Sequence, residues 1–98
     1  DNIKIFSNRW LSTFVFNNKN KRKLLNNIFE KMNENNIEVR PLWKPMHMQP
    51  VFKKYKFYNN NVSKNLFDSG ICLPSGSNMN DNELIKVSDI MYNCIKKI

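Results

Sequence analysis

The fold of this chain is best read outward from one stretch, Arg40-Pro41-Leu42-Trp43-Lys44-Pro45-Met46-His47-Met48-Gln49-Pro50. We call it the proline loop. It holds three of the four prolines, one of the two tryptophans and the only histidine. Proline fixes φ, removes a backbone donor and biases the preceding residue toward an extended conformation. The spacing therefore predicts a stiff, irregular loop rather than a helix or a central strand. Binding residues are often found on such loops.

Upstream of the proline loop, the sequence predicts a strand, a helix and a short second strand. Residues 10–16 (WLSTFVF) are rich in β-branched and aromatic side chains, which is typical of a strand. Residues 21–35 form an amphipathic helix that ends at Asn35-Asn36, because asparagine tolerates the left-handed conformation. Residues 37–40 (IEVR) alternate again and form the second strand. We interpret the basic run at 19–23 as a solvated first helical turn.

Downstream, the sequence predicts small helices, a strand and a long final helix. Residues 51–55 make one helical turn, and residues 62–68 form a short helix with Gly70 as its C-terminal glycine. Residues 71–73 form an apolar strand. The final helix starts at Asn80, with Glu83 three residues on, as in a capping box. Its apolar stripe consists of Leu84, Val87, Ile90, Met91, Cys94, Ile95 and Ile98.

These elements predict an α+β fold for residues 1–98 as a single domain: a short, mostly antiparallel sheet with two main helices on one face. No apolar run reaches the roughly 20 residues of a membrane-spanning helix, so we expect no membrane partner. Cys72 and Cys94 lie among apolar residues and are interpreted as reduced core thiols, compatible with a cytoplasmic location. One histidine and no close cysteine pair argue against a structural zinc site.

The proline loop supplies the candidate binding residues. The guanidinium of Arg40 and the ammonium of Lys44 suit phosphate oxygens, although solvated surface charge is the alternative. Trp43 either stacks on a base or sugar or packs in the interior. We favour a functional role for His47 over a structural one, because it follows two prolines and two cations. No glycine-rich phosphate loop and no catalytic triad signature is present.

Three segments resemble motifs of the DegT/DnrJ/StrS family of pyridoxal-phosphate-dependent sugar aminotransferases. They are Ser7-Asn8-Arg9-Trp10-Leu11, the proline loop and Gly70-Ile71-Cys72-Leu73-Pro74-Ser75-Gly76. The resemblance covers nearly the whole chain and is strongest to enzymes that make the 4-amino sugar of bacillosamine-type protein glycosylation from UDP-4-keto-6-deoxy-N-acetylglucosamine. It implies the small C-terminal domain of a fold-type I aminotransferase, whose large domain is absent here and which normally acts as a homodimer.

The resemblance also implies how the chemistry is divided. A lysine of the large domain holds pyridoxal 5'-phosphate, and an amino donor, usually glutamate, supplies the nitrogen. None of the family's cofactor motifs occurs in these 98 residues, so we expect the fragment to be inactive alone, to bind no cofactor or metal and to hold no catalytic residue. The substrate-binding residues implied are Arg40, Pro41, Leu42, Trp43, Lys44 and His47.

Two alternative functions are considered besides that of an aminotransferase domain that binds substrate. The net charge of +8 and the aromatic residues also suit a stand-alone nucleic-acid-binding module. Against this, the basic residues do not gather into one stripe and no RNA-binding signature is present, so we expect no nucleic-acid partner. The second alternative is a structural domain of the same enzyme, in which the proline loop only packs. The first residue, Asp1, is not methionine, so the chain is expected to be a piece of a longer protein.

Overall fold

A computed structural model describes residues 4–97, in the order β1 (Ser12–Val15), α1 (Lys21–Glu34), β2 (Arg40–Pro41), two short 3-10 helices, α2 (Val62–Ser69), β3 (Gly70–Leu73) and α3 (Asp81–Lys96). The 3-10 helices are η1 (Met46–Met48) and η2 (Pro50–Phe52). The sheet order is β1-β3-β2, and both pairings are antiparallel. The predicted α+β fold is therefore confirmed.

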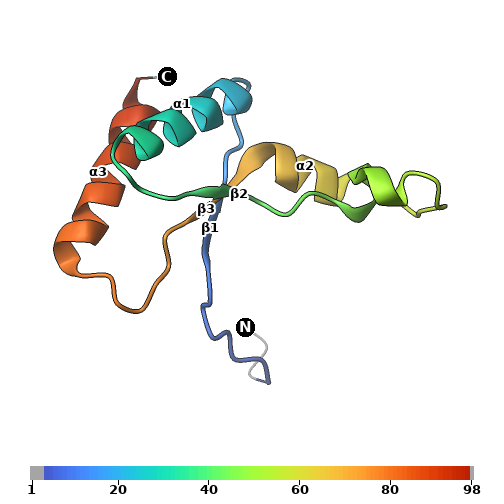
Figure 1. Cartoon of the computed structure of the whole chain (residues 1–98), viewed down its shortest axis with the longest axis horizontal. Helices are drawn as coiled ribbons and strands as arrows, with labels where there is room; N and C mark the ends of the chain where they lie inside the picture. Colours follow the sequence, from blue (N-terminus) through green and yellow to red (C-terminus); the bar gives the residue numbers. More distant parts are fainter. Residues whose placement is uncertain (1–3, 98) are drawn as a thin grey trace.

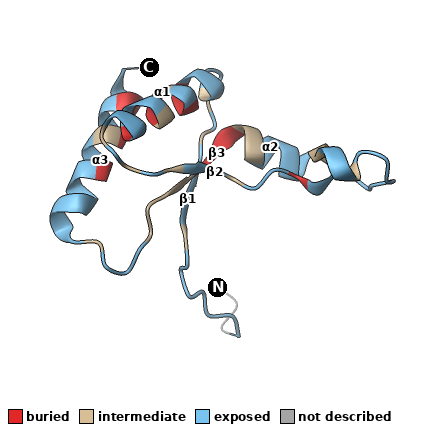
Figure 2. Cartoon of the chain, in the orientation of Figure 1, coloured by how far each residue is buried: buried red, intermediate tan, exposed pale blue. Residues whose placement is uncertain are grey.

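The core lies between α1, α3 and the central strand (Figure 1). Helices α1 and α3 bury the side chains that face each other, and the only strand side chain among them is Ile71 of β3. Figure 2 shows this buried set where the two helices meet and at the junction of α2 with β3. Its members are Leu24, Leu25, Ile28, Met32, Ile71, Val87, Met91 and Cys94.

The start of α3 follows the sequence prediction. The Oδ1 of Asn80 accepts a hydrogen bond from the Glu83 backbone N–H at 2.9 Å, and the Glu83 carboxylate accepts one from the Asn80 N–H at 2.9 Å. This capping box satisfies backbone donors that an uncapped helix leaves free. The predicted stripe is buried only in part, since Leu84 and Ile95 are 57% and 45% exposed, and Ile98 lies outside the described residues.

The second strand is shorter than predicted and begins later. Asn36 has φ 56°, and the Ile37 N–H donates to the Met32 carbonyl at 2.9 Å, so the chain is still leaving α1 at this point. Ile37 and Val39 pack against the core, and pairing starts at Arg40. Pro41 can occupy β2 because this strand lies at the sheet edge, where a missing donor is tolerated.

The glycine at the end of α2 has a different role from the one predicted. Gly70 has φ −118° and ψ 162°, so it is extended and starts β3 instead of adopting the left-handed conformation of a helix C-terminus. A side chain here would have to displace a neighbour, because a Cβ on Gly70 would lie 2.1 Å from Cδ1 of Leu42. The proline loop is thus seated directly on the start of the central strand.

The basic run at the start of α1 is largely exposed, in line with the prediction, and two of its side chains also contact the end of α2. The ammonium of Lys21 donates to the Ser69 hydroxyl at 3.0 Å, and the guanidinium of Arg22 lies 3.4 Å from the Asp68 carboxylate. Asp68 also pairs with Lys64 at 2.7 Å, and the Lys64 hydrogen bond lowers the pKa of Asp68. These contacts fasten the end of α2 to α1.

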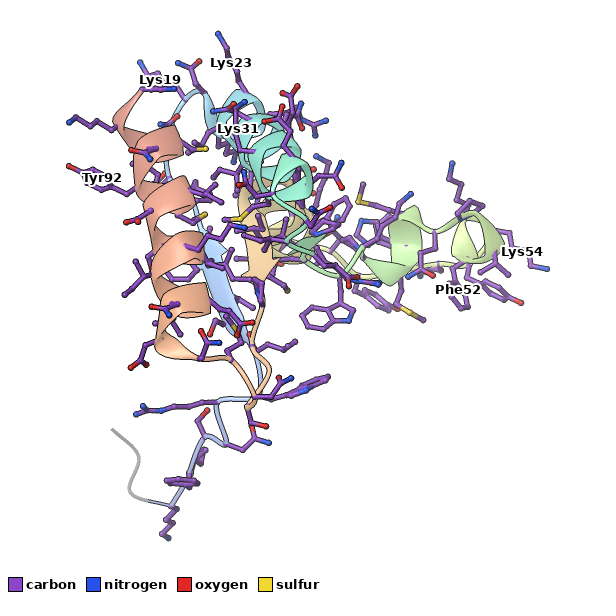
Figure 3. The ribbon with its side chains drawn as sticks, turned by 60° about the vertical axis from the view of Figure 1, so that its left-hand side comes forward. Lys19, Lys23, Lys31, Phe52, Lys54 and Tyr92 are labelled. Atoms are coloured by element: carbon purple, nitrogen blue, oxygen red, sulfur yellow. The ribbon has the colours of Figure 1, made fainter. Side chains whose placement is uncertain are left out.

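Residues 44–69 form an arm that leaves the core on one side (Figure 1). The radius of gyration is 15.9 Å, whereas a compact chain of this length has about 13 Å. Phe52 and Lys54 lie near the far end of the arm (Figure 3). Large apolar side chains are exposed along it, including Met46, Val51, Tyr55, Phe57 and Tyr58. Exposed apolar surface of this kind is typical of a region that packs against further protein.

Candidate substrate-binding groove

Three sequence-distant segments meet at one end of the sheet and line a groove with a volume of about 640 Å³. We call it the motif groove. Residue 11 comes from the segment before β1, residues 40, 41 and 43 come from the proline loop, and residues 72–76 come from β3 and the turn after it. The remaining lining residues are Glu38, Asn78 and Met79. All three motifs that carry the family resemblance therefore contribute to this groove.

The sheet brings the motifs together through a few specific contacts. Arg40 pairs with Cys72 in the β2–β3 register, and Ser12 pairs with Leu73 on the other side of β3. The Ser75 hydroxyl accepts a hydrogen bond from the Ser12 N–H at 2.8 Å and donates to the Leu73 carbonyl at 2.9 Å. Ser75 thus ties the turn after β3 to the start of β1, which fixes that wall of the groove.

Arg40 is positioned by a neighbouring carboxylate. Its Nε and Nη2 atoms donate to the same oxygen of Glu38, at 2.8 and 2.6 Å. Both side chains are exposed, so the pair contributes little to stability, about 0–1 kcal/mol. Its effect on the groove is electrostatic, because the carboxylate offsets the positive charge that the sequence alone assigned to this position.

The other predicted site residues are divided between the groove and its surroundings. Trp43 lines the groove, and its ring centroid lies 6.5 Å from that of Trp10. Leu42 is half-buried and packs on Gly70, and Lys44 is exposed beside the groove. His47 does not line it; the imidazole stacks on Phe57 in the arm, with centroids 4.5 Å apart and planes 17° apart.

Of the twelve residues that line the groove, only Arg40, Pro41 and Trp43 were predicted as site residues, and the other nine, Asn78 and Cys72 among them, were not. Asn78 lies in a polar segment that gave no signal. Cys72 was expected in the core but is half-buried and lines the groove, whereas Cys94 is buried. Alternation along β3 explains the difference, because Ile71 takes the core-facing position and its neighbour must face the other way. Burial raises the pKa of the Cys94 thiol.

The motif groove by itself does not fit pyridoxal phosphate. The cofactor is held by a lysine in enzymes that use it, and the groove lining contains no lysine among the residues that the structure describes. Within residues 4–97 no cluster of three or more histidine, cysteine, aspartate or glutamate side chains could hold a metal ion. The helices described are also too short or too polar to cross a membrane.

The class of this α+β chain is assigned by comparison with known proteins. Residues 4–92 match the model of the DegT/DnrJ/EryC1/StrS aminotransferase family, and the chain belongs to this family.

Among curated proteins, the chain is 44% identical over 89 residues to EpsN of Bacillus subtilis (strain 168), which is provisionally named a pyridoxal phosphate-dependent aminotransferase. The match covers 87% of this chain and 22% of EpsN. The chain thus spans about a fifth of the length of this relative.

Proposed function

We propose that this chain is the small C-terminal domain of a pyridoxal-phosphate-dependent aminotransferase that acts on a nucleotide-linked sugar. The observation that carries the proposal is the convergence of all three family-like motifs on the motif groove. The substrate that we propose is a UDP-linked 4-keto-6-deoxy sugar, with glutamate as the amino donor and a 4-amino sugar for glycan biosynthesis as the product. The sugar substrate follows from the family; the particular sugar follows from the resemblance of the motifs.

In this proposal the domain binds and orients the substrate, and the chemistry takes place elsewhere in the enzyme. The cofactor supplies the carrier for the amino group and would be held by the remainder of the full-length protein. Arg40, Pro41 and Trp43 contact the substrate from the groove, with Leu42 and Lys44 beside them. Binding energy gathered away from the reacting carbon lowers the barrier if it positions that carbon correctly.

His47 has a separate place in this proposal. Its imidazole is half-buried on Phe57 in the arm, so it would approach the substrate from a different side than Arg40 does. The exposed apolar side chains of the arm suit a surface that is covered by further protein. We infer that the arm packs in a homodimer of the full-length enzyme. Such an enzyme would work in the cytoplasm, where the free thiols Cys72 and Cys94 stay reduced.

The test uses the full-length enzyme and steady-state kinetics with a UDP-4-keto-6-deoxy sugar. We expect Arg40→Ala and His47→Ala each to lower kcat/KM by about tenfold or more, which corresponds to about 1.4 kcal/mol of transition-state stabilisation. Tyr92→Ala serves as a matched control, because Tyr92 projects from the outer face of α3 (Figure 3). Unchanged kcat/KM in both site variants would overturn the site assignment.

A second measurement separates the domain from the whole enzyme. The 98-residue chain, mixed with pyridoxal phosphate, should give no absorbance band of lysine-bound cofactor, whereas the full-length enzyme should give one. A stable band with the isolated chain would contradict the proposed division of labour. It would mean that one of the chain's own lysines holds the cofactor.

A further inference from the structure

We propose that the motif groove is a subsite for a flat, uncharged ring with hydrogen-bonding edges, the base of a nucleotide, rather than for its diphosphate. This inference rests on the proposed function, in which the substrate is nucleotide-linked. It reassigns Arg40, whose guanidinium suggested phosphate binding on sequence grounds. Three observations support it: the charge of the groove, the exposed indole in its wall, and an amide in its lining.

The charge of the groove argues against a diphosphate site. Among residues 4–97, the charged members of the groove lining are Arg40 and Glu38, and the two are already paired through two hydrogen bonds to one oxygen. Sites for phosphate groups use cations or helix N-termini whose charge is not offset. A diphosphate that approached Arg40 would therefore compete with the Glu38 carboxylate for its N–H donors. The arginine retains other N–H donors, which suit a neutral carbonyl oxygen.

The walls of the groove suit a planar ring. Leu11, Pro41, Pro74 and Met79 supply apolar surface, and the indole of Trp43 is 64% exposed although it lines the groove. Trp10 packs on this indole at a 43° angle, which leaves the two rings too tilted to sandwich a third ring between them. A ligand ring would therefore stack on the groove side of Trp43, with Trp10 supporting the indole from another side. Stacking on an aromatic side chain is a common mode of base binding.

The groove lining also includes a side chain that can form hydrogen bonds, the amide of Asn78. The amide of Asn78 can donate and accept at once, which matches the carbonyl and N–H edge of a pyrimidine. A Cβ on Gly76 would lie 2.7 Å from Oδ1 of Asn78, so the glycine makes room for this amide. The groove volume of about 640 Å³ falls within the range of small-molecule sites, about 300–1,000 Å³.

The experiment measures equilibrium binding of uridine and, separately, of inorganic pyrophosphate to the full-length enzyme. Trp43→Ala should raise the Kd for uridine about tenfold or more, because the stacking surface is lost, and should leave the Kd for pyrophosphate within about twofold. Trp43→Phe keeps a ring and should stay within about threefold of the wild type for uridine. Tyr92→Ala, remote from the groove, should change neither constant.

Each outcome separates the inference from the proposed function. An unchanged Kd for uridine in Trp43→Ala, in an enzyme that still converts a UDP-linked sugar, overturns the base subsite alone. A loss of pyrophosphate binding equal to the loss of uridine binding overturns it as well, because the groove would then hold the diphosphate. A wild-type enzyme that converts no UDP-linked sugar and binds no uridine overturns the proposed function, and the inference falls with it.

Discussion

Gly70→Ala is the sharpest test of how the proline loop is seated on the sheet. The new Cβ would lie 2.1 Å from Cδ1 of Leu42, about 1.4 Å inside the shortest ordinary carbon–carbon contact of about 3.5 Å. The backbone carbonyl oxygen of Leu66 lies 3.0 Å away on another side, so the Cβ cannot retreat. The leucine side chain must therefore move to make room. Overpacking of this kind costs about 1–3 kcal/mol.

The backbone of Gly70 allows the sign of the effect to be worked out. Its φ of −118° and ψ of 162° are accessible to alanine. A compatible Gly→Ala change stabilises a protein by about 0.4–1 kcal/mol through the unfolded chain. We therefore expect a net loss of up to about 2.6 kcal/mol when Leu42 is present. In a Leu42→Ala background only the close approach to the Leu66 carbonyl oxygen remains, so Gly70→Ala should cost clearly less than it does when Leu42 is present.

Urea denaturation followed by far-UV circular dichroism measures the four proteins of this double-mutant cycle. The midpoint and the slope together give the free energy of unfolding. A coupling energy of about 1 kcal/mol or more between positions 42 and 70 is expected, because the two side chains compete for one space. If Gly70→Ala lowers the free energy of unfolding equally with and without Leu42, or raises it in the otherwise unchanged chain, then Leu42 does not pack on Gly70 as described.

Three further predictions concern the scaffold and use the same denaturation assay. Ile28→Ala should cost about 2–5 kcal/mol, because the side chain is fully buried, whereas Ile85→Ala, on the exposed side of α3, should stay within about 0.5 kcal/mol. Asn80→Ala should cost about 0.5–2 kcal/mol by removing the cap of α3; no loss would contradict the capping box. The hydrogen bond from Lys64 lowers the pKa of Asp68 in the folded state. The ionised carboxylate therefore adds to the free energy of unfolding above the ordinary aspartate pKa, and this stabilisation is lost as pH falls through the lower, folded-state pKa. The difference in unfolding free energy between the wild type and Asp68→Asn should accordingly shrink at low pH.

Much of the fold could be predicted from the sequence because it depends on local rules. Helices α1 and α3 follow apolar spacing, and the capping box fixes the start of α3 at the predicted residue. The strand at residues 71–73 was also expected. The predictions went wrong where tertiary contacts decide. Residues 37–39 alternate like a strand but are held by the end of α1, and Gly70 is needed for a steric reason that comes from position 42.

For the candidate site, the sequence indicated single binding residues but not how they are arranged in space. The proline loop was found because its composition is unusual, but the sequence could not show that Glu38 offsets the charge of Arg40. Nor could it separate His47 from the groove, since that requires knowing that η1 belongs to the arm. Asn78 gave no local signal, because its place in the groove comes from the turn after β3.

The position of β3 in the chain has a consequence for how the protein folds. Of the three strands in the described part of the chain, β3 pairs with both others, yet it comes after the arm, so Val15 must find Gly70 across more than half of the chain. Contacts of such long sequence separation carry a large loop-closure cost and slow folding. During synthesis, α1 can form as soon as it emerges, but the sheet cannot begin until the arm has been made. The strand edges remain unpaired over that interval, which makes it the period of greatest exposure to aggregation.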